Sequence, residues 1–149
     1  RKICPSCKEE TTLSSEQLAF VQKVVSEIPP ASGEIPAAQT DWKFYKGKGC
    51  ESCNGSGFKG RFGIYEILIM SEEIKASLSE TISEYQVREL AKKQGMTTMQ
   101  QDGVLKALDG LTSVEEVLRV AEAPKEPFGQ LVVMIVKKRW EARLNPITA

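Results

Sequence analysis

The sequence predicts an α+β protein, in which a small knuckle lobe with short strands and one inserted helix is followed by a compact helical lobe. Two CxxC pairs account for every cysteine of the 149-residue chain, one near the N-terminus and one at residues 50–53. A β-branched and aromatic run follows the second pair at residues 61–70, which favours a strand. Four short segments with capping residues at their starts then predict helices between residues 71 and 123.

The two CxxC pairs predict a metal site. Each pair places two thiolates on one tight turn. Pro5 presets the backbone angle needed in the first turn, and Gly55 permits the positive φ that turns a backbone N–H toward sulfur in the second. Four thiolates form the closed tetrahedral shell of a structural Zn²⁺ site, so the first lobe is expected to be a zinc knuckle. The predicted ligands are Cys4, Cys7, Cys50 and Cys53.

These motifs allow three other interpretations. Disulfides require an oxidising compartment, and no signal-peptide pattern precedes Cys4. A redox CxxC lies between a strand and a helix, whereas glycines and a predicted strand follow residue 53. Residues 55–60 match GxGxxG, but they precede a strand, and Arg61 and Phe62 stand where a phosphate loop needs Lys and Ser or Thr. Zinc is favoured over all three.

The composition excludes several function classes. The chain has no histidine, which removes Ser/His/Asp and Cys/His catalysis and the HExxH metal motif. Its formal net charge is zero, so the electrostatic attraction that drives nucleic-acid binding is missing, and no nucleic-acid partner is expected.

The 42 residues between the CxxC pairs, longer than the gap of a compact zinc ribbon, predict an insertion. Ser14 with Gln17 forms a capping box, and apolar residues follow at helical spacing until Pro29 and Pro30 stop the helix. Residues 29–41 are rich in proline and small polar residues and predict an exposed loop, after which residues 42–45 form a short strand.

After the second knuckle, residues 61–70 are apolar on both faces toward their end, which predicts a mostly buried strand. Four helices follow. Their predicted capping residues are Ser71, Ser83 with Gln86, Thr98 with Gln101, and Ser113 with Glu116 or Thr112 with Glu115, and glycines 95 and 110 close the second and third. The predicted domains are therefore a zinc lobe at 1–70, a helical lobe at 71–123 and a tail at 124–149 of unknown role.

The tail contains a six-residue apolar run, which is far shorter than the roughly 20 residues that span a bilayer. A strand or short helix docked on the core is expected there. The basic residues around Trp140 either form the solvated end of that element or contact a membrane surface or an acidic partner. They are Lys137, Lys138, Arg139 and Arg143.

Several motifs in fixed order resemble one family. They are Cys4-Pro-Ser-Cys7, Gly47-Lys-Gly-Cys-Glu-Ser-Cys53, Gly60-Arg-Phe-Gly-Ile-Tyr-Glu66, Gly95-Met96, Asp102-Gly103 and Gly110-Leu-Thr-Ser-Val-Glu-Glu-Val-Leu-Arg119. From residue 1 to about residue 120 the chain resembles the C-terminal part of the hexameric motor ATPases of type II secretion and type IV pilus assembly. The tail matches no pattern of that family.

The resemblance implies a setting for the chain. In that family the tetracysteine segment binds zinc, which carries over to residues 4, 7, 50 and 53. It implies a homo-hexameric parent in the cytoplasm, peripheral at the inner membrane, working with platform or accessory proteins of the machine. ATP and Mg²⁺ belong to the parent only, because the family's Walker A, Walker B, Asp-box and His-box residues lie upstream, so this chain is not expected to hydrolyse ATP.

Within such a parent, the zinc lobe is expected to have a structural or a docking role. A basic rim around the site would favour encounter with an acidic partner surface. Its predicted members are Lys43, Lys46, Lys48, Lys59 and Arg61. The alternative is a free-standing zinc-knuckle module. Residues 50–57 match one CxxCxGxG repeat of Hsp40-type chaperones, which use several copies, and a zinc-ribbon nucleic-acid binder would need more positive charge.

Overall fold

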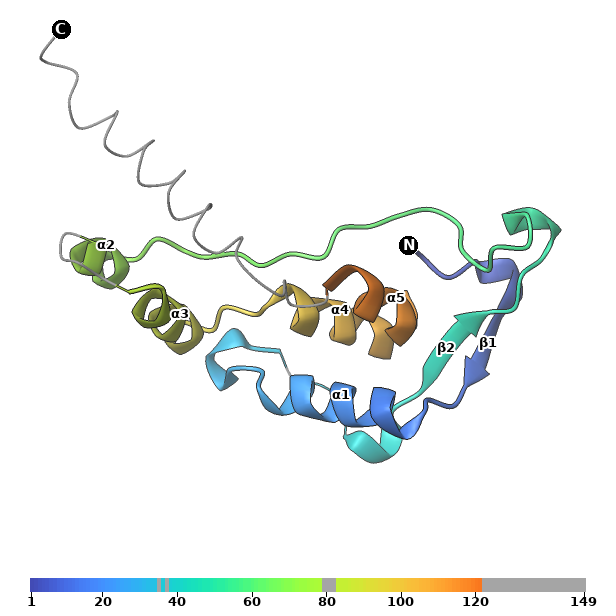
Figure 1. Ribbon diagram of the computed structural model, residues 1–149, viewed down its shortest axis with the longest axis horizontal. Coiled ribbons are helices and arrows are strands. Elements are labelled where there is room, and N and C mark those ends of the chain that lie inside the picture. The colour runs from blue at the N-terminus through green and yellow to red at the C-terminus, as the bar shows by residue number, and fades with distance from the viewer. Residues whose placement is uncertain (35, 37, 79–82, 122–149) are drawn as a thin grey trace, which may run out of the picture.

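The computed structural model describes residues 1–34, 36, 38–78 and 83–121. The described residues form five α-helices and one two-stranded antiparallel sheet, which confirms the mixed α+β class (Figure 1). The elements are β1 (Lys8–Thr11), α1 (Ser15–Ser26), β2 (Phe44–Gly47), α2 (Glu72–Leu78), α3 (Glu84–Lys93), α4 (Met99–Leu108) and α5 (Val114–Ala121). The expectations for the tail at 124–149 lie outside the described residues.

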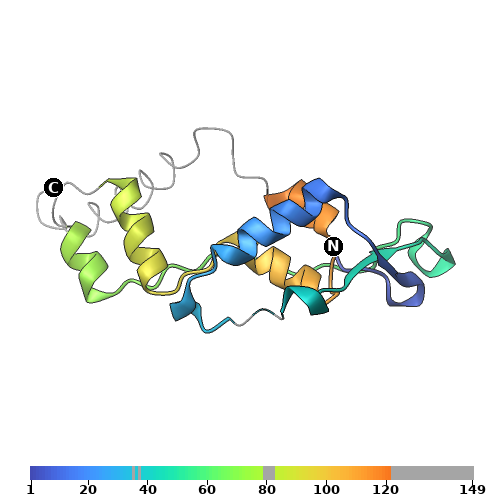
Figure 2. The same ribbon diagram turned by 90° about the horizontal axis from the view of Figure 1, so that it is seen from below.

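The molecule is elongated, and its parts follow one another along the long axis. The sheet and the cysteine turns lie at one end, α1, α4 and α5 form the middle, and the α2–α3 pair lies at the other end (Figures 1 and 2). Residues 54–71 run back along the whole length from the cysteine end to α2 (Figure 1). The extended segment therefore passes beside α4 and α5 on its way.

The predicted helix starts are confirmed. Capping boxes begin α1 at Ser14, α3 at Ser83 and α4 at Thr98. The Ser71 hydroxyl accepts the backbone N–H of Ile74 and begins α2. At α5 the Ser113 hydroxyl accepts the N–H of residue 116, so Ser113 is the capping residue of the two that the sequence left open. Capping depends on residues three apart, which is why the sequence alone predicts it.

The sheet differs from the prediction in two ways. The predicted strand at 42–45 lies two residues later, at Phe44–Gly47. Its partner β1 was missed, because Lys-Glu-Glu-Thr carries no apolar alternation. The two strands pair with Lys8 opposite Gly47 and Thr11 opposite Phe44. This hairpin stem joins the inserted helix to the cysteine turns.

The hydrophobic core joins the inserted helix to the last two helices. Val21 and Val24 of α1 pack with Val104 of α4 and Val117 of α5, and Phe44 of β2 completes the cluster. Gly103 permits the close approach of α5, because a Cβ at this position would lie 2.8 Å from Cγ1 of Val117. Residues on both sides of position 70 thus share one core. The α2–α3 pair has its own buried contacts, which involve Ile74 and Ala91.

The prediction of a mostly buried strand at 61–70 is wrong. The segment is extended, but no described strand pairs with it, and Ile67 and Ile69 are 68% and 72% exposed. Side chains of α4 hold its first half instead: Asp102 Oδ2 accepts the N–H of Tyr65 at 2.8 Å, and Lys106 Nζ donates to the carbonyl of Gly63 at 3.1 Å. The apolar pattern indicates burial but does not supply the element that would cover it.

Candidate metal centre

Two short 3-10 turns carry the four cysteines. The first spans Pro5–Cys7 and the second Glu51–Cys53. In each turn the N–H of the second cysteine donates to the carbonyl of the first, at 3.3 Å between Cys7 and Cys4 and at 3.2 Å between Cys53 and Cys50. The β1–β2 stem begins directly after the first turn and ends shortly before the second, so the two turns meet.

The four sulfur atoms have the geometry of a metal site. All four Sγ atoms lie within 4.8 Å of one another. The Cys4–Cys50 and Cys7–Cys53 Sγ distances are both 3.9 Å, and the Cys50–Cys53 distance is 3.7 Å. A tetrahedral ion with metal–sulfur bonds of about 2.3 Å requires sulfur–sulfur edges of roughly 3.8 Å. The four thiols are free cysteines, so the predicted ligands are close enough to bind one metal ion.

Backbone N–H groups point at one of the sulfurs. The N–H groups of Cys50 and Gly57 each donate to Cys53 Sγ at 3.2 Å. Asn54 and Gly55 both have positive φ, as the turn requires, but the N–H of Gly55 donates to the carbonyl of Cys50 and not to sulfur. The positive φ predicted for Gly55 is therefore confirmed, and the backbone N–H groups that point at sulfur are those of Cys50 and Gly57.

Gly57 is the residue that lets the two halves of the site close. Its φ is +75°, and a Cβ there would lie 2.4 Å from the carbonyl oxygen of Gly47. The carbonyl of Gly57 in turn accepts the N–H of Cys4 at 2.9 Å. Beside it, Ile3 forms a β-bridge with Phe58. The second knuckle is thus sealed against both the N-terminal segment and β2.

The thiols differ in how readily they become thiolates. Burial raises the pKa of the Cys7 thiol to about 12. The hydrogen bond from the Cys50 backbone, with that from Gly57, lowers the pKa of the Cys53 thiol to about 6. A metal binds the thiolate form, so Cys53 is ready to coordinate at neutral pH, whereas Cys7 must release its proton on binding.

The predicted basic rim is partly neutralised. Lys46 pairs with Glu9 at 3.6 Å, and Lys43 pairs with Glu10 at 4.0 Å, both across the β1–β2 stem. Lys59 Nζ donates to the Ser52 hydroxyl at 2.9 Å. Within the described residues, Lys48 and Lys59 of the predicted rim near the cysteines make no ion pair with a carboxylate.

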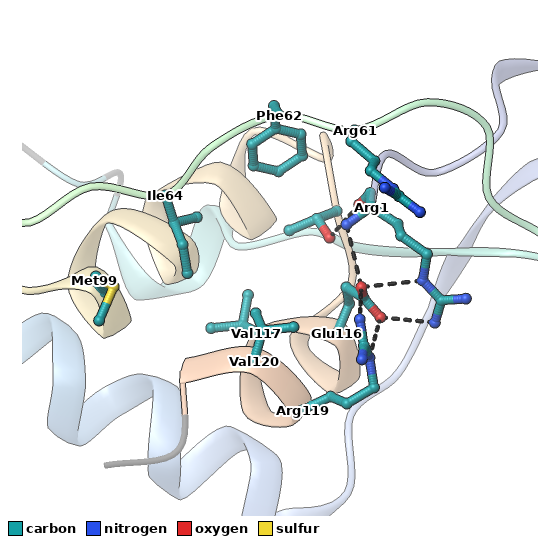
Figure 3. A pocket seen from close by; sticks show the side chains of 10 residues that line it. Arg1, Arg61, Phe62, Ile64, Met99, Glu116, Val117, Arg119 and Val120 are labelled. Atoms are coloured by element: carbon teal, nitrogen blue, oxygen red, sulfur yellow. Dashed lines mark hydrogen bonds and ion pairs between the residues drawn. The ribbon is translucent and has the colours of Figure 1, made fainter. Parts of the chain in front are cut away.

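A second cluster surrounds Glu116, which the sequence identified only as a capping partner. Its side chain is 4% exposed and binds Arg1 at 2.8 Å and Arg119 at 2.6 Å (Figure 3). The hydrogen bonds from Arg119 and Arg1 hold the pKa of Glu116 well below its ordinary range. No sequence signal links residues 115 positions apart. The cluster fastens the N-terminal segment to α5.

The four clustered cysteines and the capped helices that follow them are features shared with a known protein family. The family model of type II/IV secretion system proteins matches residues 1–119, and the chain belongs to this family. It is 37% identical over 118 residues to the type IV pilus assembly ATPase PilB of Thermus thermophilus, and 32% identical over 120 residues to the type II secretion system protein E of Pseudomonas aeruginosa. These matches cover 79% and 80% of this chain.

The chain spans only a small part of its relatives, namely 12% of the Thermus ATPase and 21% of the Pseudomonas protein. A third relative, the type IV pilus assembly ATPase TfpB of Acinetobacter baylyi, is 34% identical over 120 residues, which is 80% of this chain and 19% of TfpB. No helix in the described part of the chain is both long and apolar enough to cross a membrane.

Proposed function

We propose that this chain is the C-terminal metal-binding portion of a secretion or pilus assembly ATPase, and that it holds a structural Zn²⁺ and docks a partner of the machine. The parent is proposed to be a homo-hexamer in the cytoplasm, peripheral at the inner membrane, with ATP and Mg²⁺ bound outside this chain. The family membership and the names of the relatives support the parent role.

The donor set supports zinc as the metal. Four cysteine sulfurs at mutual distances near a tetrahedral edge suit Zn²⁺, whereas hard cations such as Mg²⁺ and Ca²⁺ prefer oxygen ligands. When bound, Zn²⁺ with four thiolates has no open position for chemistry and supplies rigidity. Here the rigidity would fix both ends of the insertion at residues 8–49.

The docking role rests on the cations that remain available. Lys48 follows β2, and its N–H donates to the carbonyl of Cys7 at 3.0 Å, so the first cysteine turn holds the backbone of Lys48 in place. Lys59 lies in the segment that pairs with residue 2, where its N–H donates to the Lys2 carbonyl at 2.9 Å. Two lysines on backbone held in this way suit encounter with an acidic surface.

The test is a double charge reversal in the full-length parent. Lys48→Glu with Lys59→Glu leaves all four cysteines intact, and transport or pilus assembly is measured together with ATP turnover and zinc content. Lys23→Glu on the exposed face of α1 is the matched control. We expect transport to fall by about tenfold or more in the double variant, while zinc content and ATP turnover hold.

Two results would overturn parts of this proposal. Unchanged transport in the double variant would leave the zinc lobe as a structural clip without a docking role. Fully folded, purified protein that contains less than one zinc per chain and has four titratable thiols would show that the site does not hold zinc.

A further inference from the structure

The second cysteine turn is followed directly by an Asn-Gly pair, Asn54 and Gly55. Both residues are exposed, and the turn lies at the cysteine end of the molecule (Figure 1). Asn54 is the one non-glycine residue with positive φ in the described part of the chain, at φ 51° and ψ 42°. Asparagine tolerates this left-handed conformation, which explains its place in the turn. An Asn-Gly pair also has a chemical reactivity of its own.

That reactivity is spontaneous deamidation. The backbone nitrogen of the glycine attacks the side-chain carbonyl carbon of the asparagine and forms a carbon–nitrogen bond. The side-chain nitrogen leaves as ammonia, together with the proton of the attacking N–H, and a five-membered succinimide ring results. Water then opens the ring at one of its two carbonyl carbons. Opening at the side-chain carbonyl gives aspartate, and opening at the backbone carbonyl gives isoaspartate, whose main chain is longer by one methylene group.

No neighbouring segment shields the pair. The side-chain amide of Asn54 makes no hydrogen bond to the residues that the structure describes, so it is free to rotate. A Cβ at Gly55 would meet no atom within 4 Å, so the space around this residue is open. A glycine also offers no side chain that would hinder the approach of its nitrogen. The surroundings of the pair therefore allow the reaction.

The closed turn is what opposes the reaction. The N–H of Gly55 donates to the carbonyl of Cys50 at 2.9 Å, and the N–H of Asn54 donates to the carbonyl of Glu51 at 3.0 Å. Ring closure requires the first of these bonds to break and the ψ angle of Asn54 to rotate away from 42°. The reaction therefore proceeds from an opened turn, and its rate follows the fraction of time that the turn is open.

A bound ion would reduce that fraction. Cys50 and Cys53 are two of the four predicted ligands, and their sulfur atoms lie 3.9 Å from those of Cys4 and Cys7. An ion that holds all four sulfurs binds the closed turn and not the opened one. At a free metal concentration of about 100 times the dissociation constant, opening becomes about a hundredfold rarer.

We propose that Asn54 is a site of spontaneous modification that depends on metal loss. The bound ion keeps the turn closed, whereas the metal-free chain converts Asn54 to isoaspartate and then binds the ion poorly. The conversion makes the loss of metal irreversible, because no step of the reaction returns the amide. This inference rests on the zinc site of the proposed function.

The longer main chain explains the loss of metal affinity. The N–H of Gly57 donates to Cys53 Sγ at 3.2 Å, and the carbonyl of Gly57 accepts the N–H of Cys4. An added methylene group between residues 54 and 55 displaces Gly57 from both partners. The close packing of Gly57 against Gly47, where a Cβ would lie 2.4 Å from the carbonyl oxygen, leaves no room for the shift. The loss of an N–H partner to a ligand typically lowers metal affinity by about 10- to 100-fold.

Mass spectrometry of the 149-residue chain tests the proposal. Chain loaded with Zn²⁺ and chain stripped with a chelator are incubated at neutral pH under reducing conditions, after zinc content has been measured. The metal-free chain should deamidate about a hundredfold faster than chain kept in free Zn²⁺ at about 100 times the dissociation constant. Asn145 is the one other asparagine of the sequence, and it precedes Pro146, whose nitrogen carries no proton. Peptide mapping should therefore place the conversion at Asn54.

The variant Asn54→Asp is the matched control for the second step, because it has the new charge without the longer main chain. The converted chain should bind Zn²⁺ about tenfold or more weakly than the unaltered chain. Asn54→Asp should bind it within about fivefold of the unaltered chain, because its charge is exposed. An equal loss of affinity in the variant and in the converted chain would overturn the role of the longer main chain.

Equal rates of deamidation with and without Zn²⁺ would overturn the proposal. The zinc content then separates two failures. About one zinc per chain would mean that the ion binds without protecting the turn, so this inference alone fails. Chain without zinc would show that the proposed metal site fails as well. A converted chain that binds Zn²⁺ as tightly as the unaltered chain would overturn the irreversible loss of metal.

Discussion

The cysteine turns and residues 65–70 follow each other closely in the chain but differ in how their structure is determined. In the turns, the residues that hold the sulfur atoms in position all lie within the described chain. For example, Cys53 Sγ accepts two backbone N–H groups. In the extended segment, strongly apolar side chains lie on the surface, and Ile69 is 72% exposed. The difference teaches that a cysteine turn finds its partners among nearby residues, whereas an apolar extended segment needs a second element to become buried.

The strongest way to break this comparison is to remove one of the four predicted metal ligands. Cys50→Ser should lower the free energy of unfolding by about 3 kcal/mol or more, because metal affinity adds directly to folding energy at a site that is absent from the unfolded chain. Urea denaturation measures the loss in the free energy of unfolding. Amide exchange, measured by mass spectrometry, should accelerate more in β1 and β2 than in α4 and α5. Ser52→Ala, on the exposed side of the same turn, should change neither.

A pair of glycine substitutions sharpens the account of the turns. Gly55 and Gly57 have the same φ of +75°, but a Cβ at Gly55 meets no atom within 4 Å, whereas one at Gly57 meets the Gly47 carbonyl. Gly55→Ala should cost about 1 kcal/mol from backbone strain alone. Gly57→Ala should cost about 2–3 kcal/mol, because overpacking is added. Equal losses in urea denaturation would show that the close approach to Gly47 is not needed.

The Glu116 cluster lies between the two regions and gives a pH test. The pKa of Glu116 is lower in the folded chain than its ordinary 4.5, so its carboxylate stabilises the fold above that pH, and the contribution is lost as the pH falls toward the folded value. Glu116→Gln should lower the free energy of unfolding at pH 7 by about 2 kcal/mol. The gap to the unaltered chain should narrow below about pH 4.5.

The matched control is Glu115→Gln, because residue 115 is exposed on the same helix. Urea denaturation of the three proteins at pH 7, 5 and 3 provides the measurement, and each variant is compared with the unaltered chain at the same pH. A gap for Glu116→Gln that stays constant across this range would contradict the lowered pKa.

The features that the sequence predicted well depend on residues close together in the chain. The cysteine pairs and the capping boxes each involve residues three apart, and their outcome is confirmed at Ser14, Ser83 and Thr98. Features that depend on distant residues were missed. The polar strand β1 exists because β2 pairs with it, and Glu116 meets Arg1 only after the whole chain has folded.

The identity of the N–H donors to sulfur was also out of reach of the sequence. Several glycines follow Cys53, and any of them can adopt positive φ. The closure of Gly57 against Gly47 aims the Gly57 N–H at Cys53 Sγ, which also accepts the N–H of Cys50. Residue type therefore predicted the left-handed turn, whereas the tertiary contact with Gly47 determines that the Gly57 N–H donates to the sulfur.

The smallest expected effect is also the most direct test of the exposed segment. Ile67→Ser and Ile69→Ser should each change the free energy of unfolding of the 149-residue chain by no more than about 0.5 kcal/mol, because both side chains already lie in solvent. Val104→Ala, fully buried between α1 and α5, should lose about 2 kcal/mol under the same conditions.

If Ile67→Ser costs as much as Val104→Ala, the segment is buried in this chain as its apolar pattern predicts, and the comparison fails.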